Sequence, residues 1–406
     1  MSKTKVANRR FSLALFVTLL YLAGCQAVPP EHSDLGTQVA KRVSAKAETS
    51  SMLGTGDVAD DPAVWVHPTN KSRSVILGTN KSKDGRGGLY AFDLDGKRFG
   101  SDEWVSGVNR FDNERYNSVD LRYNFPAGQE RWDIVAASNR SDREIDIFKV
   151  RKTASGDFSG LQKVGELPLG SGLAPGSDAP YGLAMYYSQR LGRYYVFISD
   201  KEGRVAQYQL RYNPSGSLAR ENLVTADRLG LWDVSDDGLP VEGIVADDEK
   251  DVVYIASENL GLYRYGTTDG KLNPNNRTTV DTPGKRLQAD IEGLTLHYAA
   301  NGQGYLIASS QGSDSYTIYE RSFLSGKANS FVTDFAISSG AVDEVTNTDG
   351  IDVASVNLGG AFKGGLFIAH DGEGNSPSNY KLLPWTSVAG GELRVDTSQD
   401  PRRKTP

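Results

Sequence analysis

Apolar and polar residues alternate along most of this chain with the two-residue period of β-strands, and turn residues interrupt them at short intervals. The clearest stretch is residues 290–311, DIEGLTLHYAANGQGYLIASSQ, where two such runs flank Asn301-Gly302. Asn-Gly between apolar runs is the strongest short-range signal for a β-hairpin. In that hairpin the first strand starts beside the end of the second, so Asp290, Glu292 and Gln311 should share the edge opposite the turn.

The second strand of this hairpin recurs along the chain as a short apolar run closed by a small or polar residue. The closing residues, which follow one another at intervals of 52 to 61 residues, are Thr79, Ser138, Ser199, Ser257, Ser309 and His370. First strands recur in the same order, at residues 61–68, 118–125, 181–188, 242–248, 292–298 and 349–355. Six copies of three or four short strands predict an all-β protein, a six-bladed β-propeller. A long β-sandwich is the alternative, but it does not explain why first and second strands recur together at the same varying intervals.

The composition narrows the class of protein. With 44 glycines and 19 tyrosines among 406 residues, the chain is rich in turns and β-forming residues. The net charge of −6 argues against a general nucleic-acid binder. The single cysteine, Cys25, excludes a disulfide framework and the CxxC zinc patterns. We find no GxxxxGK[ST] nucleotide loop and predict no second domain.

Residues 1–24 have the pattern of a bacterial lipoprotein signal peptide. Positive charges at residues 3–10 precede an apolar run of twelve residues, 11–22, which is too short to span a bilayer core of about 30 Å. The sequence LAGC at 22–25 resembles a lipobox, in which Cys25 would carry the lipid. By the same resemblance, Gln26 rather than Asp after it suggests the outer membrane of the cell envelope. An ordinary cleaved secretory signal is the alternative.

The remaining domain boundaries follow from composition. Residues 25–47 are small and polar, which predicts a tether. Residues 48–403 carry the six repeats and are expected to form the propeller. Residues 380–385 are candidates for the third strand of the last blade, with the N-terminal residues adding its closing strand. The charged tail after Gln399 is expected to be disordered.

The repeats should bring charged residues together at one mouth of the ring, where first strands start and second strands end. Lys81, Arg140 and Lys201 fall at this edge in blades one to three, and acids fall there in blades four to six. Crowded carboxylates repel one another unless a cation lies among them, and oxygen ligands suit Ca²⁺. The basic side, with Tyr181 as a hydroxyl donor, suits phosphate oxygens. Four histidines are too few for a zinc site, and His370, the one at the mouth, is expected to be a spectator.

The chain resembles a known family, the β-propeller phytases. These are calcium-dependent enzymes that release phosphate from myo-inositol hexakisphosphate, which is called phytate. The resemblance runs from about residue 48 to residue 403. It rests on motifs that include GDVADDPAVWVHP, NSVDLRYNFP, AASNRS, SDKEG, EGIVADDE and NTDGIDV. The family fold is a six-bladed propeller, in agreement with the repeats.

The resemblance also implies roles for individual residues. Ligands of structural or bridging calcium would be Glu48, Asp57, Asp61, the carbonyls of Pro62 and Val119, Asp349 and Asp371. Ligands of the catalytic calcium cluster would be Glu242, Glu258, Asp290, Glu292 and Gln311. Phosphate contacts, which together with Glu242 form the expected catalytic set, would be Lys81, Arg140, Tyr181 and Lys201. Family members often carry a second lysine after the first, whereas Ser82 follows Lys81 here, so that contact stays open.

The resulting hypothesis is a calcium-dependent phosphomonoesterase, a 3-phytase by resemblance. It would convert phytate, or calcium–phytate, to lower inositol phosphates and phosphate. The sequence has no RHGxRxP histidine motif and no Cys-x5-Arg loop, so we expect attack by a calcium-bound water. Two alternatives stay open: a calcium-dependent lactonase or esterase, and a non-catalytic propeller that binds a glycan or a protein. We expect several calcium ions, a monomer, a lipid anchor and no nucleic-acid partner.

Overall fold

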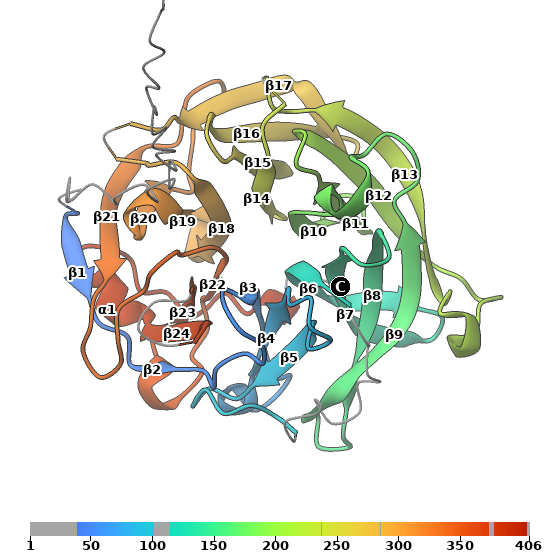
Figure 1. Cartoon of the computed structure of the whole chain (residues 1–406), viewed down its shortest axis with the longest axis horizontal. Coiled ribbons are helices and arrows are strands. Elements are labelled where there is room, and N and C mark those ends of the chain that lie inside the picture. The colour runs from blue at the N-terminus through green and yellow to red at the C-terminus, as the bar shows by residue number, and fades with distance from the viewer. Residues whose placement is uncertain (1–38, 101–113, 237, 285, 373–376, 404–406) are drawn as a thin grey trace, which may run out of the picture. The chain divides into compact units, whose positions relative to one another are not determined.

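The structure is a computed structural model that describes residues 39–100, 114–236, 238–284, 286–372 and 377–403. Their strands form six small sheets of three to five strands. The sheets stand as blades around a common centre, with β3, β6, β10, β14, β18 and β22 innermost (Figure 1). This arrangement confirms the prediction of an all-β, six-bladed propeller.

Each blade takes consecutive antiparallel strands from one part of the chain, apart from two strands near the N-terminus. Blades one and two contain β3 (Ala59–Trp65), β4 (Val75–Asn80) and β5 (Gly88–Phe92), then β6 (Tyr116–Ala127), β7 (Glu130–Asn139), β8 (Glu144–Lys152) and β9 (Phe158–Pro168). Blades three and four contain β10 (Leu183–Ser188), β11 (Arg193–Ser199), β12 (Arg204–Tyr212) and β13 (Val224–Asp233), then β14 (Val241–Asp247), β15 (Val252–Ser257), β16 (Gly261–Thr268) and β17 (Lys271–Asp281). Blades five and six contain β18 (Ile291–Tyr298), β19 (Gly304–Ser310), β20 (Ser315–Glu320) and β21 (Phe331–Ile337), then β22 (Ile351–Ala354), β23 (Leu366–Asp371) and β24 (Asn379–Pro384).

The second strands of the blades are buried almost throughout. In β15, β19 and β23 every residue is buried. These strands lie inside their sheets, and the neighbouring blades cover both faces; Ala256 of blade four and Leu306 of blade five, for example, belong to one apolar cluster. Burial on both faces explains why the second strands are continuous apolar runs rather than alternating ones.

The hairpin predicted at residues 290–311 is present. Strand β18 pairs antiparallel with β19, with Ile291 opposite Ser310. The backbone N–H of Gln311 donates to the carbonyl of Asp290 at 2.9 Å. Asn301 adopts a left-handed conformation with φ of 60° at the turn, which Asn tolerates better than most residues. The start of the first strand therefore lies beside the end of the second, as predicted.

Two N-terminal strands complete the outer edges of the last two blades. Strand β2 (Ala47–Glu48) pairs antiparallel with β24, so that Glu48 lies opposite Lys381. Strand β1 (Lys41–Val43) pairs parallel with β21, with Lys41 opposite Phe335. The propeller therefore starts at Lys41, inside the segment 25–47 that we predicted to be a tether. Residues 1–38, with the predicted signal peptide and Cys25, lie outside the described residues.

The structure describes the C-terminal segment as far as Arg403, and the expectation of disorder after Gln399 is wrong for residues 400–403. Pro401–Arg403 form a short 3₁₀ helix. Arg402 pairs with Asp133 through two nitrogens, at 3.0 and 2.6 Å, and its Nε donates to the carbonyl of Val66 at 2.6 Å. Asp133 is only 1% exposed, and this buried carboxylate gives the arginine a fixed partner.

Few of the described residues lie in helices. The α-helix α1 (Trp385–Ala389) has five residues and follows β24. The 3₁₀ helices are Lys71–Arg73, Gly176–Asp178, Leu218–Arg220, Ala300–Gly302, Gln311–Ser313, Gly360–Phe362 and Pro401–Arg403. None of the helices in the described part of the chain combines the length and the apolar character that crossing a membrane requires.

Candidate functional site

Three glutamates converge where blades four and five meet. Glu242 is the second residue of β14, Glu258 follows β15, and Glu292 is the second residue of β18. One carboxylate oxygen of each lies within 4.8 Å of those of the other two. The N–H of Ile291 donates to the carbonyl of Glu258 at 2.9 Å, which joins the two blades directly at this point. The strand ends themselves therefore position the cluster.

Burial makes ionisation of all three glutamates costly. Glu292 is 5% exposed, and burial, followed by the charge of Glu242, raises its pKa well above the ordinary range. Burial likewise raises the pKa of Glu258 to about 7. Burial also acts on Glu242, but its hydrogen bond with Glu292 and the charge of Lys81 outweigh this effect and lower its pKa. Burial and the neighbouring charge therefore favour the neutral form of Glu292, whereas the surroundings of Glu242 favour its ionised form.

The glutamate cluster fits a cation. Among the described residues, Glu258 Oε1 and Glu292 Oε2 are buried without a hydrogen-bond partner. Buried polar atoms normally have one. After burial and the charge of Glu242, the charge of Asp290 further raises the pKa of Glu258, so a fourth carboxylate lies nearby. Crowded carboxylate oxygens without partners are ligands suited to a hard divalent ion such as Ca²⁺.

The cations of blades two and three lie against the ring of Tyr181. Lys201 Nζ is 4.3 Å and Arg140 Cζ is 5.4 Å from the ring centroid. The tyrosine hydroxyl donates to Glu242. Burial, followed by the charge of Glu242, raises the pKa of Tyr181 far above its usual value, so the phenol stays a neutral donor. Arg140 and Lys201 are thus immediate neighbours of the glutamate cluster.

Asn117 connects Arg140 with the glutamate cluster, and the sequence analysis did not predict this role. Its Nδ2 donates to Glu242 Oε1 at 2.5 Å, while its Oδ1 accepts from Arg140 Nη1 at 2.8 Å. These opposite partners determine which end of the amide faces which group. Asn117 is 1% exposed and lies near the start of β6, a mouth position by the repeat. The repeat predicts Val119 and Arg140 as the mouth residues of blade two, and Asn117, which heads the NSVDLRYNFP motif, is not among them.

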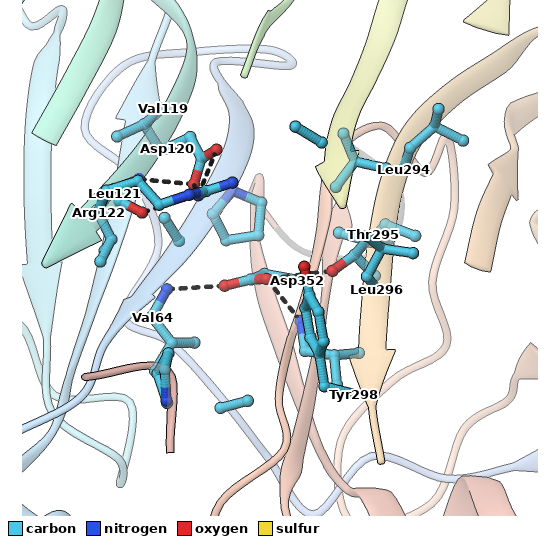
Figure 2. A pocket seen from close by; sticks show the side chains of 18 of the residues that line it. Val64, Val119, Asp120, Leu121, Arg122, Leu294, Thr295, Leu296, Tyr298 and Asp352 are labelled. Atoms are coloured by element: carbon cyan, nitrogen blue, oxygen red, sulfur yellow. Dashed lines mark hydrogen bonds and ion pairs between the residues drawn. The ribbon is translucent and has the colours of Figure 1, made fainter. Parts of the chain in front are cut away.

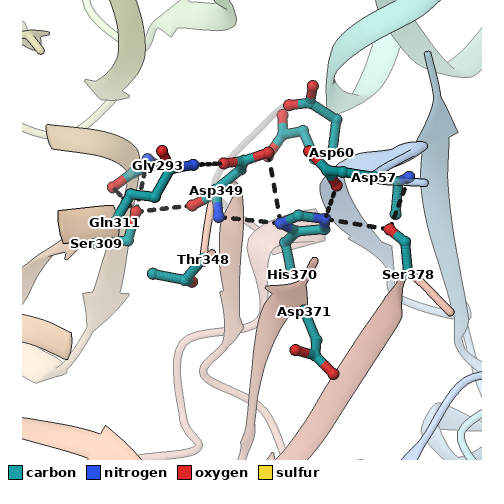
Figure 3. A network of polar contacts seen from close by, with 12 residues as sticks. Asp57, Asp60, Gly293, Ser309, Gln311, Thr348, Asp349, His370, Asp371 and Ser378 are labelled. Atoms are coloured by element: carbon teal, nitrogen blue, oxygen red, sulfur yellow. Dashed lines mark hydrogen bonds and ion pairs between the residues drawn. The ribbon is translucent and has the colours of Figure 1, made fainter. Parts of the chain in front are cut away.

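Lys81, the blade-one cation, lies among acids. Its Nζ is 3.0 Å from Asp57, 3.1 Å from Asp60 and 3.0 Å from Asp349. These aspartates gather around His370 (Figure 3). The N–H of Asp349 donates to His370 Nδ1 at 3.1 Å, and His370 Nε2 lies 3.2 Å from Asp57. The division into a basic and an acidic side therefore holds for Arg140 and Lys201, but Lys81 is neutralised by acids of blades one and six.

Gln311 and Asp349 bring the aspartates next to the glutamate cluster. Gln311 Nε2 donates to Asp349 Oδ1, and Ser309 Oγ donates to the carbonyl of Asp349 at 2.7 Å (Figure 3). The charge of Asp349 is among the causes, after burial and Glu242, that raise the pKa of Glu292. The predicted ligands Asp57, Asp349, Gln311 and Glu292 are therefore brought together.

Two other predicted ligands lie around a lysine. Lys381 Nζ pairs with Glu48 and Asp343, and it lies 2.9 Å from Asp371. The lysine side chain is fully buried. The single charge of Lys381 offsets only part of the charge of three carboxylates, so Glu48 and Asp371 remain candidate ligands in a group that a lysine shares, as Asp57 and Asp349 do around Lys81.

Asp61, Pro62 and Val119 line a central cavity of about 160 Å³. Burial raises the pKa of Asp61 well above its usual value, and the charge of Glu242 adds to this shift. All six innermost strands line this cavity. Asp61 Oδ2 accepts from the backbone N–H of Val119 at 3.0 Å. Farther along the wall, Arg122 pairs with Asp120 at 3.0 Å, and Asp352 accepts from the N–H of Val64 at 2.8 Å (Figure 2). The charged wall of the cavity is thus largely paired.

Comparison with known proteins decides the family. The family model described as Phytase matches residues 10–405. This chain is a member of the phytase family. A 3-phytase of Bacillus subtilis (strain 168) is 36% identical over 359 residues, which cover 86% of this chain and 85% of the relative. Among solved structures, the computationally designed Ika8 protein covers 79% of this chain and 70% of its own, with a TM-score of 0.35 and 12% identity, too little to support any argument.

In this member of the phytase family, the predicted site residues fall into separate groups. Four of the five residues in the catalytic set predicted from the sequence, Arg140, Tyr181, Lys201 and Glu242, form one contiguous cluster with Asn117. The fifth, Lys81, lies among the aspartates. Acidic groups that could hold a metal ion adjoin it, formed by Glu242, Glu258 and Glu292 and by Asp57, Asp349 and His370. A third such group, Glu144, Asp146 and Glu166, already surrounds Lys163.

Proposed function

We propose that this phytase-family protein hydrolyses phytate to lower inositol phosphates and phosphate in a calcium-dependent reaction. The observation that carries the proposal is the continuous contact from Arg140 through Asn117 to Glu242. A phosphate group bound by Arg140 and Lys201 would lie directly beside carboxylates suited to a divalent cation. The similarity to a relative described as a 3-phytase supports phytate as the substrate.

Calcium is the ion that the ligand set favours, because the candidate ligands are all oxygen atoms. Glu242, Glu258 and Glu292 would hold it, with Asp290 and Gln311 beside them. When bound, calcium would neutralise phosphate oxygens and activate the attacking water. A bound cation would favour the ionised form of these carboxyl groups.

The protein's own cations provide the second half of the chemistry. Arg140 and Lys201 bind phosphate oxygens and stabilise the negative charge that develops in the transition state. Asn117 holds the guanidinium of Arg140 in place, and the single hydroxyl hydrogen of Tyr181, which Glu242 accepts in the structure, would turn to a phosphate oxygen when phosphate binds. Lys81 completes the set. We expect it to contribute less than Arg140, because three aspartates already balance its charge.

We further propose that the phosphate leaves by direct attack of water, without a phosphorylated enzyme. No serine, cysteine or histidine of the sequence stands in a recognised nucleophile motif. A single in-line displacement inverts the configuration at phosphorus. A chiral phosphate ester should therefore give inverted product. Net retention, or a phosphorylated side chain trapped by rapid quenching, would show a covalent intermediate.

An assay of phosphate release tests the function itself. The purified protein is incubated with phytate, with a neutral lactone and with a carboxylic ester, each with calcium and with excess chelator. We expect phosphate release from phytate with calcium and little with chelator. Lactone or carboxylic-ester hydrolysis without phosphate release would favour the lactonase or esterase alternative. Phytate left intact under all conditions would contradict the proposed function.

A further inference from the structure

The face of the propeller opposite the mouth carries exposed apolar side chains. We call it the far face; it is formed by the turns that join first to second strands and third to fourth strands. Within the described ranges, the large apolar residues that are exposed are Leu218, Leu324 and Val395, at 47%, 75% and 48%. Leu218 lies between β12 and β13, Leu324 between β20 and β21, and Val395 after β24, so all three belong to the far face. One exposed leucine is ordinary, but three on the same face of three blades form a pattern.

Two of these apolar tips carry a cation in the same turn. The N–H of Lys327 donates to the carbonyl of Leu324 at 3.0 Å, which closes a turn in which both side chains are exposed. Leu218 opens the 3₁₀ helix Leu218–Arg220, and Arg220 at its end is exposed as well. Exposed apolar side chains beside lysine or arginine are typical of surfaces that enter the headgroup region of a membrane.

Other parts of the far face add positive charge, although the whole chain has a net charge of −6. At the outer edge of blade two, a groove of about 510 Å³ has Glu130 as the one acid among its lining residues, and its cations are Arg131, Lys149, Arg151 and Lys152. The acids of the turn between β14 and β15 pair with arginines: Asp248 with Arg122, Glu249 with Arg321 and Asp251 with Arg190. The far face therefore suits an anionic partner.

The described chain also enters the propeller from the far face. Strand β1 runs parallel to β21, which starts after the far-face turn 321–330 and runs toward the mouth. Lys41, the first residue of β1, donates from Nζ to the carbonyls of Ser387 and Val388 at 2.7 and 2.8 Å. These two residues lie in α1, which follows the far end of β24. The start of the propeller is therefore directed toward the far face.

The length of the preceding chain limits how far the propeller can stand from a lipid anchor. The predicted tether between Cys25 and the described residues, 26–38, can extend about 45 Å at most, and a flexible chain of its length spans about 20 Å. A lipid on Cys25 would therefore hold the far face, rather than the mouth, close to the bilayer.

We propose that the far face of the propeller docks on an anionic phospholipid surface. Leu218, Leu324 and Val395 enter the headgroup region, and the cations around them lie against lipid phosphates. The mouth then faces away from the membrane, where a substrate in solution reaches it. This inference goes beyond the proposed function and does not depend on it.

The orientation of the full-length lipidated protein on vesicles tests the inference. Cys25 is the single cysteine, so once it carries lipid an introduced cysteine is the only free thiol. A fluorophore is attached to Leu324→Cys on the far face or to Asp142→Cys, which is exposed at the mouth after β7. The vesicles contain equal parts of phosphatidylcholine and phosphatidylglycerol, with a quenching nitroxide at the headgroup. We expect strong quenching at residue 324 and little at residue 142. Equal quenching at the two positions, or stronger quenching at the mouth, would overturn the inference.

Charge variants test the chemistry of the contact. Each cation near an anionic membrane contributes about fivefold to binding, so Arg220→Gln with Lys327→Gln should lower the docked population about twenty-five-fold. Quenching at residue 324 should fall accordingly, and it should also fall on vesicles of phosphatidylcholine alone. Lys83→Gln with Arg86→Gln, which removes the same charge from an exposed loop at the mouth, is the matched control and should leave quenching unchanged. Equal effects of the two double variants would contradict docking through the far face.

Two further outcomes are separated by the same samples. An unquenched label at residue 324 in protein that cross-links as a dimer through that label would assign the far face to a second copy and overturn the inference. Labelling of the wild-type thiol would show that Cys25 carries no lipid, and the anchor would then be wrong. In that case sedimentation of the unlipidated protein with the same vesicles decides: binding that Arg220→Gln with Lys327→Gln weakens supports the far-face contact, and no binding overturns it.

Discussion

At the scale of single residues, Asn117 joins two kinds of chemistry. Its amide has a donor end and an acceptor end, which face Glu242 and Arg140 respectively. A carboxylate in its place would repel Glu242, and an apolar residue would leave both partners without this bond. Asn117 is therefore a positioning residue for the phosphate-binding arginine.

We expect Asn117→Ala to lower kcat for phytate about tenfold to a hundredfold, because Arg140 loses the bond that aims it at the reacting phosphate. KM should change less than kcat, since the misplacement matters most in the transition state. Steady-state kinetics, with the melting temperature as a check of folding, measure both effects. Asn213→Ala, which alters an exposed turn, is the control. An unchanged kcat in Asn117→Ala would mean that the bond has no positioning role.

The position of the charged residues at the mouth could be predicted from where they stand in the strands. Which of them pair with one another could not be predicted from the sequence. Alternation and the repeat show that Glu242 and Glu292 begin first strands at the mouth, and the structure places them there. The pairing of Lys81 with Asp349 joins residues from the first and last blades. Such contacts depend on how blades tilt and which rotamers fit, and neither is contained in a local sequence pattern. Asn117 could not be predicted for the same reason, because its contact with Glu242 joins blades two and four.

At the scale of elements, the short C-terminal helix Pro401–Arg403 was not predictable from composition alone. Its charged sequence suggested disorder, but Arg402 reaches Asp133 in β7 and Val66 after β3. Burial alone would raise the pKa of Asp133, but the hydrogen bonds and the charge of Arg402 outweigh it and lower that pKa. The helix thus ties the chain end to blades one and two.

We predict that Arg402→Gln lowers the free energy of unfolding by about 1.5–3 kcal/mol at pH 7, the usual range for hydrogen bonds to charged groups. A carboxylate with a lowered pKa in the folded state stabilises the fold above the ordinary Asp pKa, about 3.9. This contribution begins to decrease as the pH falls below that value, and it is lost as the pH passes through the lowered pKa of the folded state. The difference between wild type and variant should therefore shrink in urea unfolding at about pH 3.5.

The exposed pair Arg211–Asp227 provides the matched control for this variant. Such surface pairs contribute about 0–1 kcal/mol, so Arg211→Gln should change stability little at either pH. Equal stability of Arg402→Gln and wild type at pH 7 would contradict a stabilising role of the C-terminal helix.

At the scale of the whole molecule, the ring closes through contacts between residues far apart in sequence. Strand β2 pairs with β24, and buried Lys381 bonds Glu48 across that pair. At the mouth, Asp57 of blade one and Asp349 and His370 of blade six form an acidic group within 4.8 Å. A cation in that group would tie the first blade to the last.

Calcium should therefore stabilise the fold as well as serve catalysis. Binding to the folded state alone adds about 2.7 kcal/mol at a free concentration one hundred times Kd. We expect excess chelator to lower the melting temperature by several degrees, measured by scanning calorimetry. The effect should be smaller in Asp349→Asn. A melting curve that is the same with calcium and with chelator would contradict structural calcium.

The location of the protein is a separate proposal. We propose that Cys25 carries lipid and anchors the propeller to the outer membrane of the cell envelope, since LAGC follows a short apolar run. Wild type should fractionate with membranes, and Cys25→Ala should be released or retained as an unprocessed precursor. Wild type that is as freely soluble as Cys25→Ala would contradict the anchor.

The central claim is that the glutamate cluster holds the calcium that supports cleavage of phytate beside Arg140 and Lys201. The most direct measurement is phosphate release from phytate as a function of free calcium, for wild type, Glu258→Gln and the control Arg211→Gln. Glu258→Gln removes one carboxylate ligand and keeps the shape of the side chain. The account predicts no release without calcium, saturation in wild type and Arg211→Gln at the same calcium concentration, and a much higher requirement in Glu258→Gln. Phosphate release that is independent of calcium, or the same calcium dependence in Glu258→Gln as in wild type, would contradict it.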